Sequence, residues 1–220
     1  MKKFYFAFAG LAAAALVSTA QAGTLEDVKS RDEVKCVFST GLAGFAFPDD
    51  KGNWTGFDVD FCRATAAAVL GDAQKIGPVP ATTQNRFTVL NAGEADVLWR
   101  NTTITFSRDV GVKLTFLGVN YYDGQGFMAK KSLGINSALE LDGASVCIQT
   151  GTTTELNLAD YFRSNNMTYE AVPVADSAEA RECYSSGRGD VLTTDASALS
   201  SQRAAMENPD DHMVLPEIIS

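Results

Sequence analysis

Several polar side chains of the sequence are of the types that bind a zwitterion. Arg108 ends the polar run RNTTITFSR, where an arginine beside Asn101 and Thr103 can grip a carboxylate in bidentate fashion. Asp195 follows the apolar residues of GDVLTTD and suits an ammonium group. Thr153, in GTTTE, lies at a predicted helix start, where free backbone N–H groups attract an anion. Together these residues are typical of a site for an α-amino acid.

Each candidate has a structural alternative that the pattern leaves open. Asp195 can instead cap a helix that starts at the next residue. Thr152, which we also count as a candidate ligand-binding residue, forms a capping box with Glu155. Arg108 can equally be a surface arginine near a chain turn.

Aromatic side chains follow the first predicted strand in the loop GLAGFAFPDDKGNW. Aromatic residues on a glycine-rich loop are suited to wall a pocket. We therefore add Phe45 to the candidate site, with Phe47 beside it and Trp54 as a weaker candidate.

A short repeat places two of the candidates at corresponding positions. GEADVLWRNTT and GRGDVLTTDASALS each contain a glycine, an aspartate three residues later and a Val-Leu pair, with Asp96 matching Asp190 and Asn101 matching Asp195. Each copy predicts a buried strand that is followed by a polar residue, Asn101 or Asp195. Ligands of open parallel sheets bind beyond the carboxyl ends of the strands. If the two α/β units face each other, both polar residues therefore lie in one cleft.

The elements that position these residues alternate between strand and helix along the chain. We predict strands at 34–39, from 79, 96–99, 144–149, 168–174, 190–193 and 212–215, and extended chain at 113–119 and 126–129 around a turn at 120–124. We predict helices at 57–70, 84–92, 152–165, 177–186 and 196–206, and a loop at 41–54. This alternation predicts mainly parallel sheets covered by helices.

The first 22 residues are typical of a secretory signal peptide. Lys2 and Lys3 precede an apolar run, and AQA before Gly23 is a cleavage site. Removing these residues would take the net charge from −9 to −11. An acidic chain without a basic cluster is a poor partner for nucleic acid, so we expect an exported protein that does not bind nucleic acid.

Four cysteines, Cys36, Cys62, Cys147 and Cys183, allow three complete pairings, and the spacing does not choose among them. Each can also be a small buried residue without a bridge. With no C-x-x-C and one histidine, His212, we expect no metal site. The sequence also lacks G-x-S-x-G, H-E-x-x-H and G-x-x-x-x-G-K, so we expect no catalytic residue and no cofactor.

Five stretches, GLAGFAFPDDKGNWTGFDVDFCRA, DVLWRNTTITFSRD, YYDGQGFMAKK, IQTGTTTELNLADYF and GDVLTTDASALSSQRA, together resemble the periplasmic amino-acid-binding proteins of ABC importers. The resemblance implies an α/β, two-lobed type II solute-binding fold, with lobe 1 at 23–123 and lobe 2 at 124–220. It also implies that Arg108, helped by Thr103 and Thr153, holds the ligand carboxylate and that Asp195 holds the ammonium. Asn101 and Phe45 fall at positions that line the cleft in this family.

Three features depart from the family's pattern. Gly189 stands where relatives often carry a cysteine, so a bridge to Cys147 would be missing unless Cys183 replaces it. Trp99 stands where a small polar residue is usual. Relatives also continue beyond Ser220, so we expect an incomplete first lobe with an unpaired strand edge, exposed apolar surface and poor stability.

The resemblance implies a monomeric periplasmic receptor that captures L-amino acids and delivers them to an inner-membrane ABC permease. Two alternatives remain at this point. One is an enzyme on the same fold, such as a periplasmic dehydratase. The other is a sensor or a non-functional truncated relative.

Overall fold

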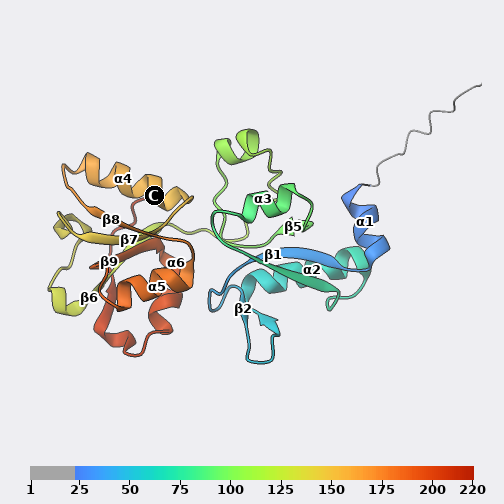
Figure 1. Cartoon of the computed structure of the whole chain (residues 1–220), viewed down its shortest axis with the longest axis horizontal. Helices are drawn as coiled ribbons and strands as arrows, with labels where there is room; N and C mark the ends of the chain where they lie inside the picture. The colour runs from blue at the N-terminus through green and yellow to red at the C-terminus, as the bar shows by residue number, and fades with distance from the viewer. Residues whose placement is uncertain (1–22) are drawn as a thin grey trace, which may run out of the picture.

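The computed structural model describes residues 23–220 as two α/β bodies, lobe 1 and lobe 2, joined by an extended stretch of chain (Figure 1). The elements of lobe 1 are α1 (Thr24–Arg31), β1 (Val34–Ser39), β2 (Phe47–Pro48), β3 (Trp54–Thr55), α2 (Phe57–Leu70), β4 (Ile76–Ala81), α3 (Arg86–Asn91), β5 (Val97–Leu98) and the π-helix η1 (Ser107–Gly111). The elements of lobe 2 are β6 (Gln125–Lys130), the 3-10 helices η2 (Lys131–Leu133) and η3 (Ala138–Glu140), β7 (Ser145–Gln149), α4 (Thr153–Ser164), β8 (Glu170–Val174), α5 (Ser177–Ser185), β9 (Val191–Asp195), α6 (Ala196–Ala204), the 3-10 helix η4 (Pro209–Asp211) and β10 (His212–Val214). The predicted signal peptide lies outside the described residues.

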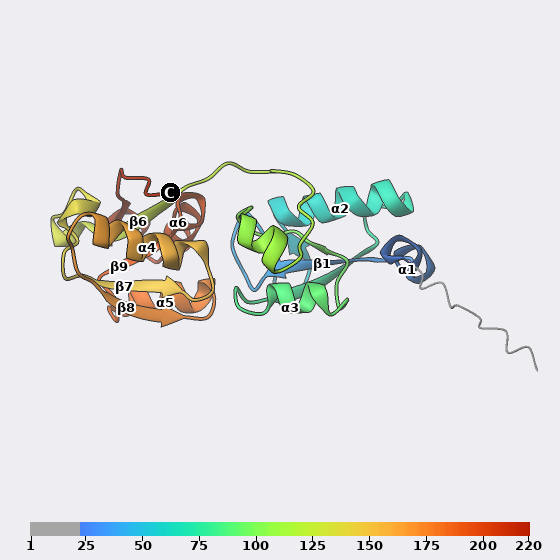
Figure 2. The ribbon, with the colours of Figure 1, turned by 90° about the horizontal axis from the view of Figure 1, so that it is seen from above.

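Lobe 1 is built on a three-stranded parallel sheet of order β4-β1-β5. Alternate residues of β1 face opposite sides, as a strand requires. Cys36 and Phe38 pack against α2, whereas Val37 packs in the cluster that includes Val89 of α3. The two helices therefore cover opposite faces of the sheet (Figure 2). A disulfide between Cys36 and Cys62 links β1 to α2.

Lobe 2 is built on a five-stranded mixed sheet of order β10-β6-β9-β7-β8. β7 pairs in parallel with β8 and β9, and β6 pairs antiparallel with β9 and β10. Phe127 and Ile148 face α4, whereas Met128 and Cys147 face α5 and α6. A disulfide between Cys147 and Cys183 links β7 to α5, so Cys147 is bridged although residue 189 is a glycine.

Two predicted elements have the predicted bounds, the strand at 34–39 and the helix at 57–70. Gly71 ends that helix with φ of 73°, a left-handed conformation that glycine adopts without strain. The strand predicted from Val79 starts earlier, at Ile76, because its pairing with β1 begins at Val34.

The predicted loop at 41–54 contains a short hairpin that the sequence did not reveal. β2 and β3 pair antiparallel, with Phe47 opposite Thr55. The turn between them is closed by Asp49 Oδ1, which accepts hydrogen bonds from the backbone N–H of Lys51 at 2.9 Å and of Asn53 at 2.8 Å. Strands of two residues are too short for a periodic pattern to show.

The connection between the lobes differs from the prediction in one respect. Residues 113–124 form no regular element and no turn, and the chain runs extended from lobe 1 into β6 (Figure 2). The turn predicted at 120–124 is therefore wrong. Within residues 23–220, no helix has the length and apolar character needed to span a membrane.

Hydrogen bonds between side chains and backbone also join the two lobes directly. The Thr83 hydroxyl, on the chain between β4 and α3, lies 3.0 Å from the carbonyl oxygen of Thr150 and 3.1 Å from that of Ala175. On α6, the Ser201 hydroxyl donates to the carbonyl oxygen of Ala43 at 2.6 Å. The two lobes are therefore in direct contact in this structure.

Candidate ligand-binding site

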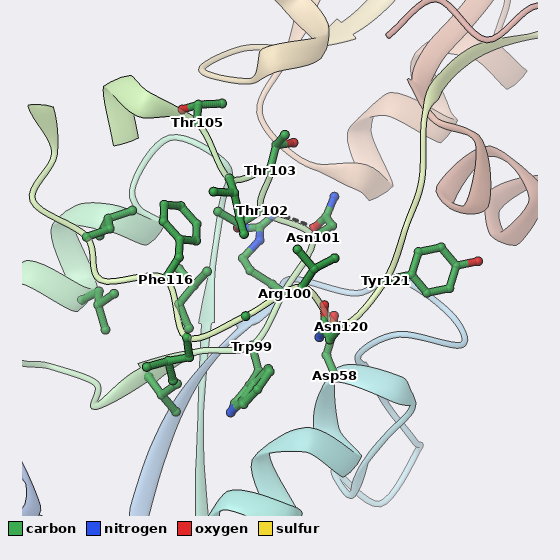
Figure 3. A pocket seen from close by; sticks show the side chains of 18 of the residues that line it. Asp58, Trp99, Arg100, Asn101, Thr102, Thr103, Thr105, Phe116, Asn120 and Tyr121 are labelled. Atoms are coloured by element: carbon green, nitrogen blue, oxygen red, sulfur yellow. Dashed lines mark hydrogen bonds between the residues drawn. The ribbon is translucent and has the colours of Figure 1, made fainter. Parts of the chain in front are cut away.

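A cavity of about 1070 Å³ is lined by residues of both lobes. Lobe 2 contributes the end of β9 and the first turn of α4, and lobe 1 contributes the chain that follows β5. Asn101, Thr102 and Thr103 lie along that chain in Figure 3. Five of the seven candidate residues line this cavity, namely Phe45, Asn101, Thr103, Thr153 and Asp195.

Asp195 lies at the N-terminal end of α6 but does not cap the helix with its side chain. The capping alternative is therefore wrong for this residue. Burial, and then the carboxylate of Asp123, raise the pKa of Asp195. A hydrogen bond from Asn101 and the charges of Arg86 and Arg108 act in the opposite direction. A partly buried carboxylate in this setting is suited to receive an ammonium group.

Arg108 is buried in η1 at 7% exposure and does not itself line the cavity. Its guanidinium donates to the carbonyl oxygen of Thr103 at 2.8 Å and lies over the ring of Phe87, 5.3 Å from the centroid. Burial lowers the pKa of Arg108, and the charge of Asp195 raises it. The two groups therefore influence each other electrostatically although they belong to different lobes.

Two threonines meet at the boundary between the lobes. Thr103 Oγ1 lies 3.2 Å from Thr153 Oγ1, which is in the first turn of α4. Their hydroxyls and the free N–H groups of the helix start lie on the cavity wall, where an anionic group can accept hydrogen bonds from them.

Thr152 does not line the cavity and has a structural task. Its hydroxyl accepts a hydrogen bond from the Glu155 N–H at 3.1 Å, and Glu155 in turn accepts one from the Gly151 N–H at 2.9 Å. Thr152 therefore caps α4 as the sequence predicted, whereas Glu155 bonds to the N–H of Gly151 and not to that of Thr152, the bond that a capping box requires.

Phe45 belongs to an aromatic wall at the lobe 1 side of the cavity. Its ring meets those of Phe57 and Tyr121 edge to face, at centroid distances of 6.1 Å and 5.8 Å. Trp99, the departure from the family pattern, stacks on Phe61 at 4.9 Å and donates its indole N–H to Thr65 at 3.2 Å. Trp99 therefore packs on α2 as well as lining the cavity.

Three charged residues near the cavity were not foreseen, namely Asp58, Arg86 and Arg100. They are 4%, 2% and 7% exposed. Burial lowers the pKa of Arg86 to about 8 and that of Arg100 to about 10. Arginine keeps its proton in proteins, so these shifts express the cost of burying a cation, which a bound anion offsets. Arg86 is the first residue of α3, and nothing in the local sequence pattern signals that it is buried.

Residues 34–207 match the family model described as bacterial extracellular solute-binding proteins, family 3. The chain belongs to this family. The predicted two-lobed type II fold is thereby confirmed, and the family is one of solute-binding proteins rather than enzymes.

Other family 3 members show how far the similarity extends. The chain is 57% identical over its whole length to the glutamate/glutamine/aspartate/asparagine-binding protein BztA of Rhodobacter capsulatus, covering 65% of that protein. Over 92% of its length it is 55% identical to the general L-amino acid-binding periplasmic protein AapJ of Rhizobium johnstonii, covering 60% of it. The chain thus spans less than two thirds of these curated relatives.

Solved structures of the family have the same arrangement. A periplasmic binding protein of an ABC transporter from Brucella ovis, with glutathione bound, is 56% identical and superposes with a TM-score of 0.88 over 91% of this chain and 63% of its own. An ancestral arginine-binding protein bound to arginine is 26% identical, with a TM-score of 0.73 over 86% of this chain and 81% of its own.

Proposed function

We propose that this protein is a periplasmic solute-binding protein that captures L-amino acids and delivers them to an ABC permease in the inner membrane. The observation that carries the proposal is the opposite charge of two groups from different lobes. Asp195 of lobe 2 lines the cavity, and Arg108 of lobe 1 donates a hydrogen bond to the cavity-lining Thr103. The charge of each group shifts the pKa of the other. An α-amino acid has one anionic and one cationic end, which match these two groups.

The same geometry supports a role for each side chain. Asp195 takes the ligand ammonium, because its carboxylate is partly buried and is not used as a helix cap. The carboxylate is held by the start of α4 with Thr153, by Thr103 and by the charge of Arg108. Asn101 and Phe45 complete the wall of the cavity.

Closure of the two lobes is the step that presents a loaded receptor to its permease. The direct contacts of Thr83 and Ser201 across the lobes belong to such a closed state. The names of the relatives support the solute class, since they include glutamate, glutamine and general L-amino acids. Export by the signal peptide, a monomeric state and no binding of nucleic acid by a chain of net charge −9 remain parts of this proposal.

Calorimetric titration of the full chain with a panel of L-amino acids tests the proposal. Arg108→Ala and Asp195→Ala are each expected to weaken binding by roughly 10- to 100-fold, because the first removes the positive charge that attracts the ligand carboxylate and the second removes the acceptor for the ligand ammonium. Arg188→Ala removes an exposed charge of lobe 2 and is the control, expected to bind as the wild type does. Wild-type protein that binds none of the amino acids would refute the proposed function, and equal binding by both variants would refute the site.

A further inference from the structure

A second pair of opposite charges, Asp58 and Arg100, lies buried in lobe 1 at the wall of the cavity (Figure 3). Asp58 is in the first turn of α2, and Arg100 follows β5. Neither residue belongs to the proposed amino-acid site formed with Arg108 and Asp195. The Asp58 side chain lines the cavity and is only 4% exposed.

Arg100 is held in place by the backbone and by a neighbour. One terminal nitrogen donates to the carbonyl oxygen of Ala81, at the end of β4, at 2.8 Å. The other donates to Asn101 Oδ1 at 3.2 Å, and Nε has no partner. The guanidinium is therefore a cation fixed by two hydrogen bonds, and its buried Nε–H has no partner.

Asp58 has no comparable set of partners. Its Oδ2 atom is buried without a hydrogen bond, and no cation of residues 23–220 pairs with it within 4.0 Å. Burial raises the pKa of Asp58 to about 7, and the charge of Arg100 is the effect that opposes this rise. Arg100 is thus the cation that offsets the cost of a buried carboxylate.

This arrangement matters for the side chain of a ligand. A ligand with a second cation would be attracted by a free Asp58 carboxylate at the cavity wall. In this chain it also meets the positive charge of Arg100 at the cavity wall, and the like charges of Arg86 and Arg108 act in the same direction. Specificity often arises in this way, from an element that repels the wrong partner.

We propose that Arg100 is a specificity-determining residue whose fixed positive charge at the cavity wall makes the cavity reject amino acids with basic side chains. The inference rests on the proposed function, because it names the class of amino acid that the same site excludes. Arg100 also keeps Asn101 Oδ1 occupied, which leaves the amide N–H₂ of Asn101 to face Asp195.

The test compares L-lysine with L-glutamine, two ligands of similar length that differ in the charge of the side chain. Their dissociation constants are measured by calorimetry for the wild type, Arg100→Gln, Asp58→Asn and the double variant. We expect the wild type to prefer glutamine and Arg100→Gln to shift the lysine-to-glutamine ratio at least 10-fold toward lysine. Arg188→Gln removes the same charge from the surface and is expected to keep the wild-type ratio.

The double variant and the single Asp58 variant give separate checks. Arg100→Gln with Asp58→Asn is expected to lose the gain for lysine, because the carboxylate that attracts it is gone. Asp58→Asn alone, which leaves Arg100 without its counter-ion, is expected to reject lysine several-fold more strongly than the wild type. This second variant tests the proposal even if Arg100→Gln does not fold.

Several results would overturn the inference. The first is a lysine-to-glutamine ratio in Arg100→Gln that lies within 2-fold of the wild-type ratio. The second is a gain in lysine affinity that persists in the double variant. The third is a lysine-to-glutamine ratio in Asp58→Asn that equals that of the wild type. Each differs from failure of the proposed function, in which the wild-type protein binds neither amino acid.

Discussion

Asp96 and Asp190, the aspartates of the sequence repeat, perform the same structural task in the two lobes. Asp96 accepts a hydrogen bond from the Lys35 N–H at 2.7 Å and returns one to the Lys35 carbonyl oxygen at 2.9 Å. Asp190 does the same with Ser145, at 2.9 Å and 2.8 Å. Each aspartate thus fixes the strand that follows it beside a parallel neighbour, β5 beside β1 and β9 beside β7. The polar residues at the far ends of these strands, Asn101 and Asp195, then face one cavity.

The buried carboxylate of Asp58 predicts a dependence of stability on pH. Its pKa is raised to about 7, so between about pH 4 and pH 7 the folded protein keeps a proton that the unfolded chain has released. The free energy of unfolding therefore falls as pH rises through this window, by roughly 2–4 kcal/mol. Asp58→Asn, neutral at every pH, is expected to lose this fall when urea unfolding is measured at about pH 4.5 and pH 8.

Asp60→Asn is the matched control, because Asp60 is exposed on the same helix. It is expected to keep the pH dependence of the wild type. The same pH dependence in both variants would show that the Asp58 carboxylate is not desolvated in the folded protein.

At the scale of single elements, the start of α4 serves two purposes through adjacent threonines. Thr152→Ala removes the helix cap and is expected to lower the free energy of unfolding by about 1 kcal/mol. Thr153→Ala leaves the cap intact and removes the hydroxyl that faces Thr103, so it is expected to weaken amino-acid binding with little change in stability. Urea unfolding and calorimetric titration of both variants separate the two tasks. A loss of stability in Thr153→Ala larger than that in Thr152→Ala would contradict this division.

Gly189, which precedes β9, leaves room for the disulfide between Cys147 and Cys183 in lobe 2. A Cβ atom at Gly189 would lie 2.5 Å from the Sγ atom of Cys147 and 3.1 Å from its backbone nitrogen. Gly189→Ala is therefore expected to lower the free energy of unfolding by about 1–3 kcal/mol, the usual cost of overpacking. Gly111→Ala, where an added Cβ meets nothing within 4 Å, is the control. Equal melting temperatures for the two variants would mean that the bridge moves aside at little cost.

Elements with strong local signals were predictable from the sequence. The apolar run of β1, and the alanine-rich α2 ending at Gly71, need no partner to be recognised. The β2–β3 hairpin and the antiparallel pairing of β6 depend on contacts with distant residues, which no local pattern encodes. In the site, the polar motifs pointed to the cavity-lining residues. Burial of Arg86 and Arg100 could not be foreseen, because arginine is usually exposed and only the fold encloses it.

At the scale of the whole molecule, apolar side chains gather on the exposed chain between β5 and β6. Phe106 is 82% exposed, Leu117 77% and Tyr122 90%. β5 is an edge strand that pairs only with β1 among the described strands. The low stability that we expected from such a surface stays a prediction.

Binding of the dye ANS measures this surface directly. The wild-type protein at neutral pH is expected to enhance ANS fluorescence, and Phe106→Ser with Leu117→Ser is expected to reduce the enhancement. Leu156→Ser, an exposed apolar residue of α4, is the control and is expected to change it little. A folded wild-type protein that does not bind the dye would show that the exposed side chains form no continuous patch.

The contacts that join the lobes predict a change in affinity without any change in the cavity. Thr83→Val keeps the shape of the side chain but removes the hydroxyl that lies within hydrogen-bonding distance of the carbonyl oxygens of Thr150 and Ala175. Loss of one hydrogen bond, about 1 kcal/mol, from the closed state alone weakens ligand binding by about 5-fold, because a smaller fraction of the protein is closed. Thr82→Val is the matched control, since the Thr82 hydroxyl bonds to Asn85 within lobe 1. Calorimetry is expected to show the weakening, and small-angle scattering a larger radius of gyration, for the Thr83 variant only. Equal affinities for the two variants would mean that the Thr83 hydroxyl does not stabilise the closed state. Lobe closure would then depend on the contacts of the ligand with Arg108 and Asp195.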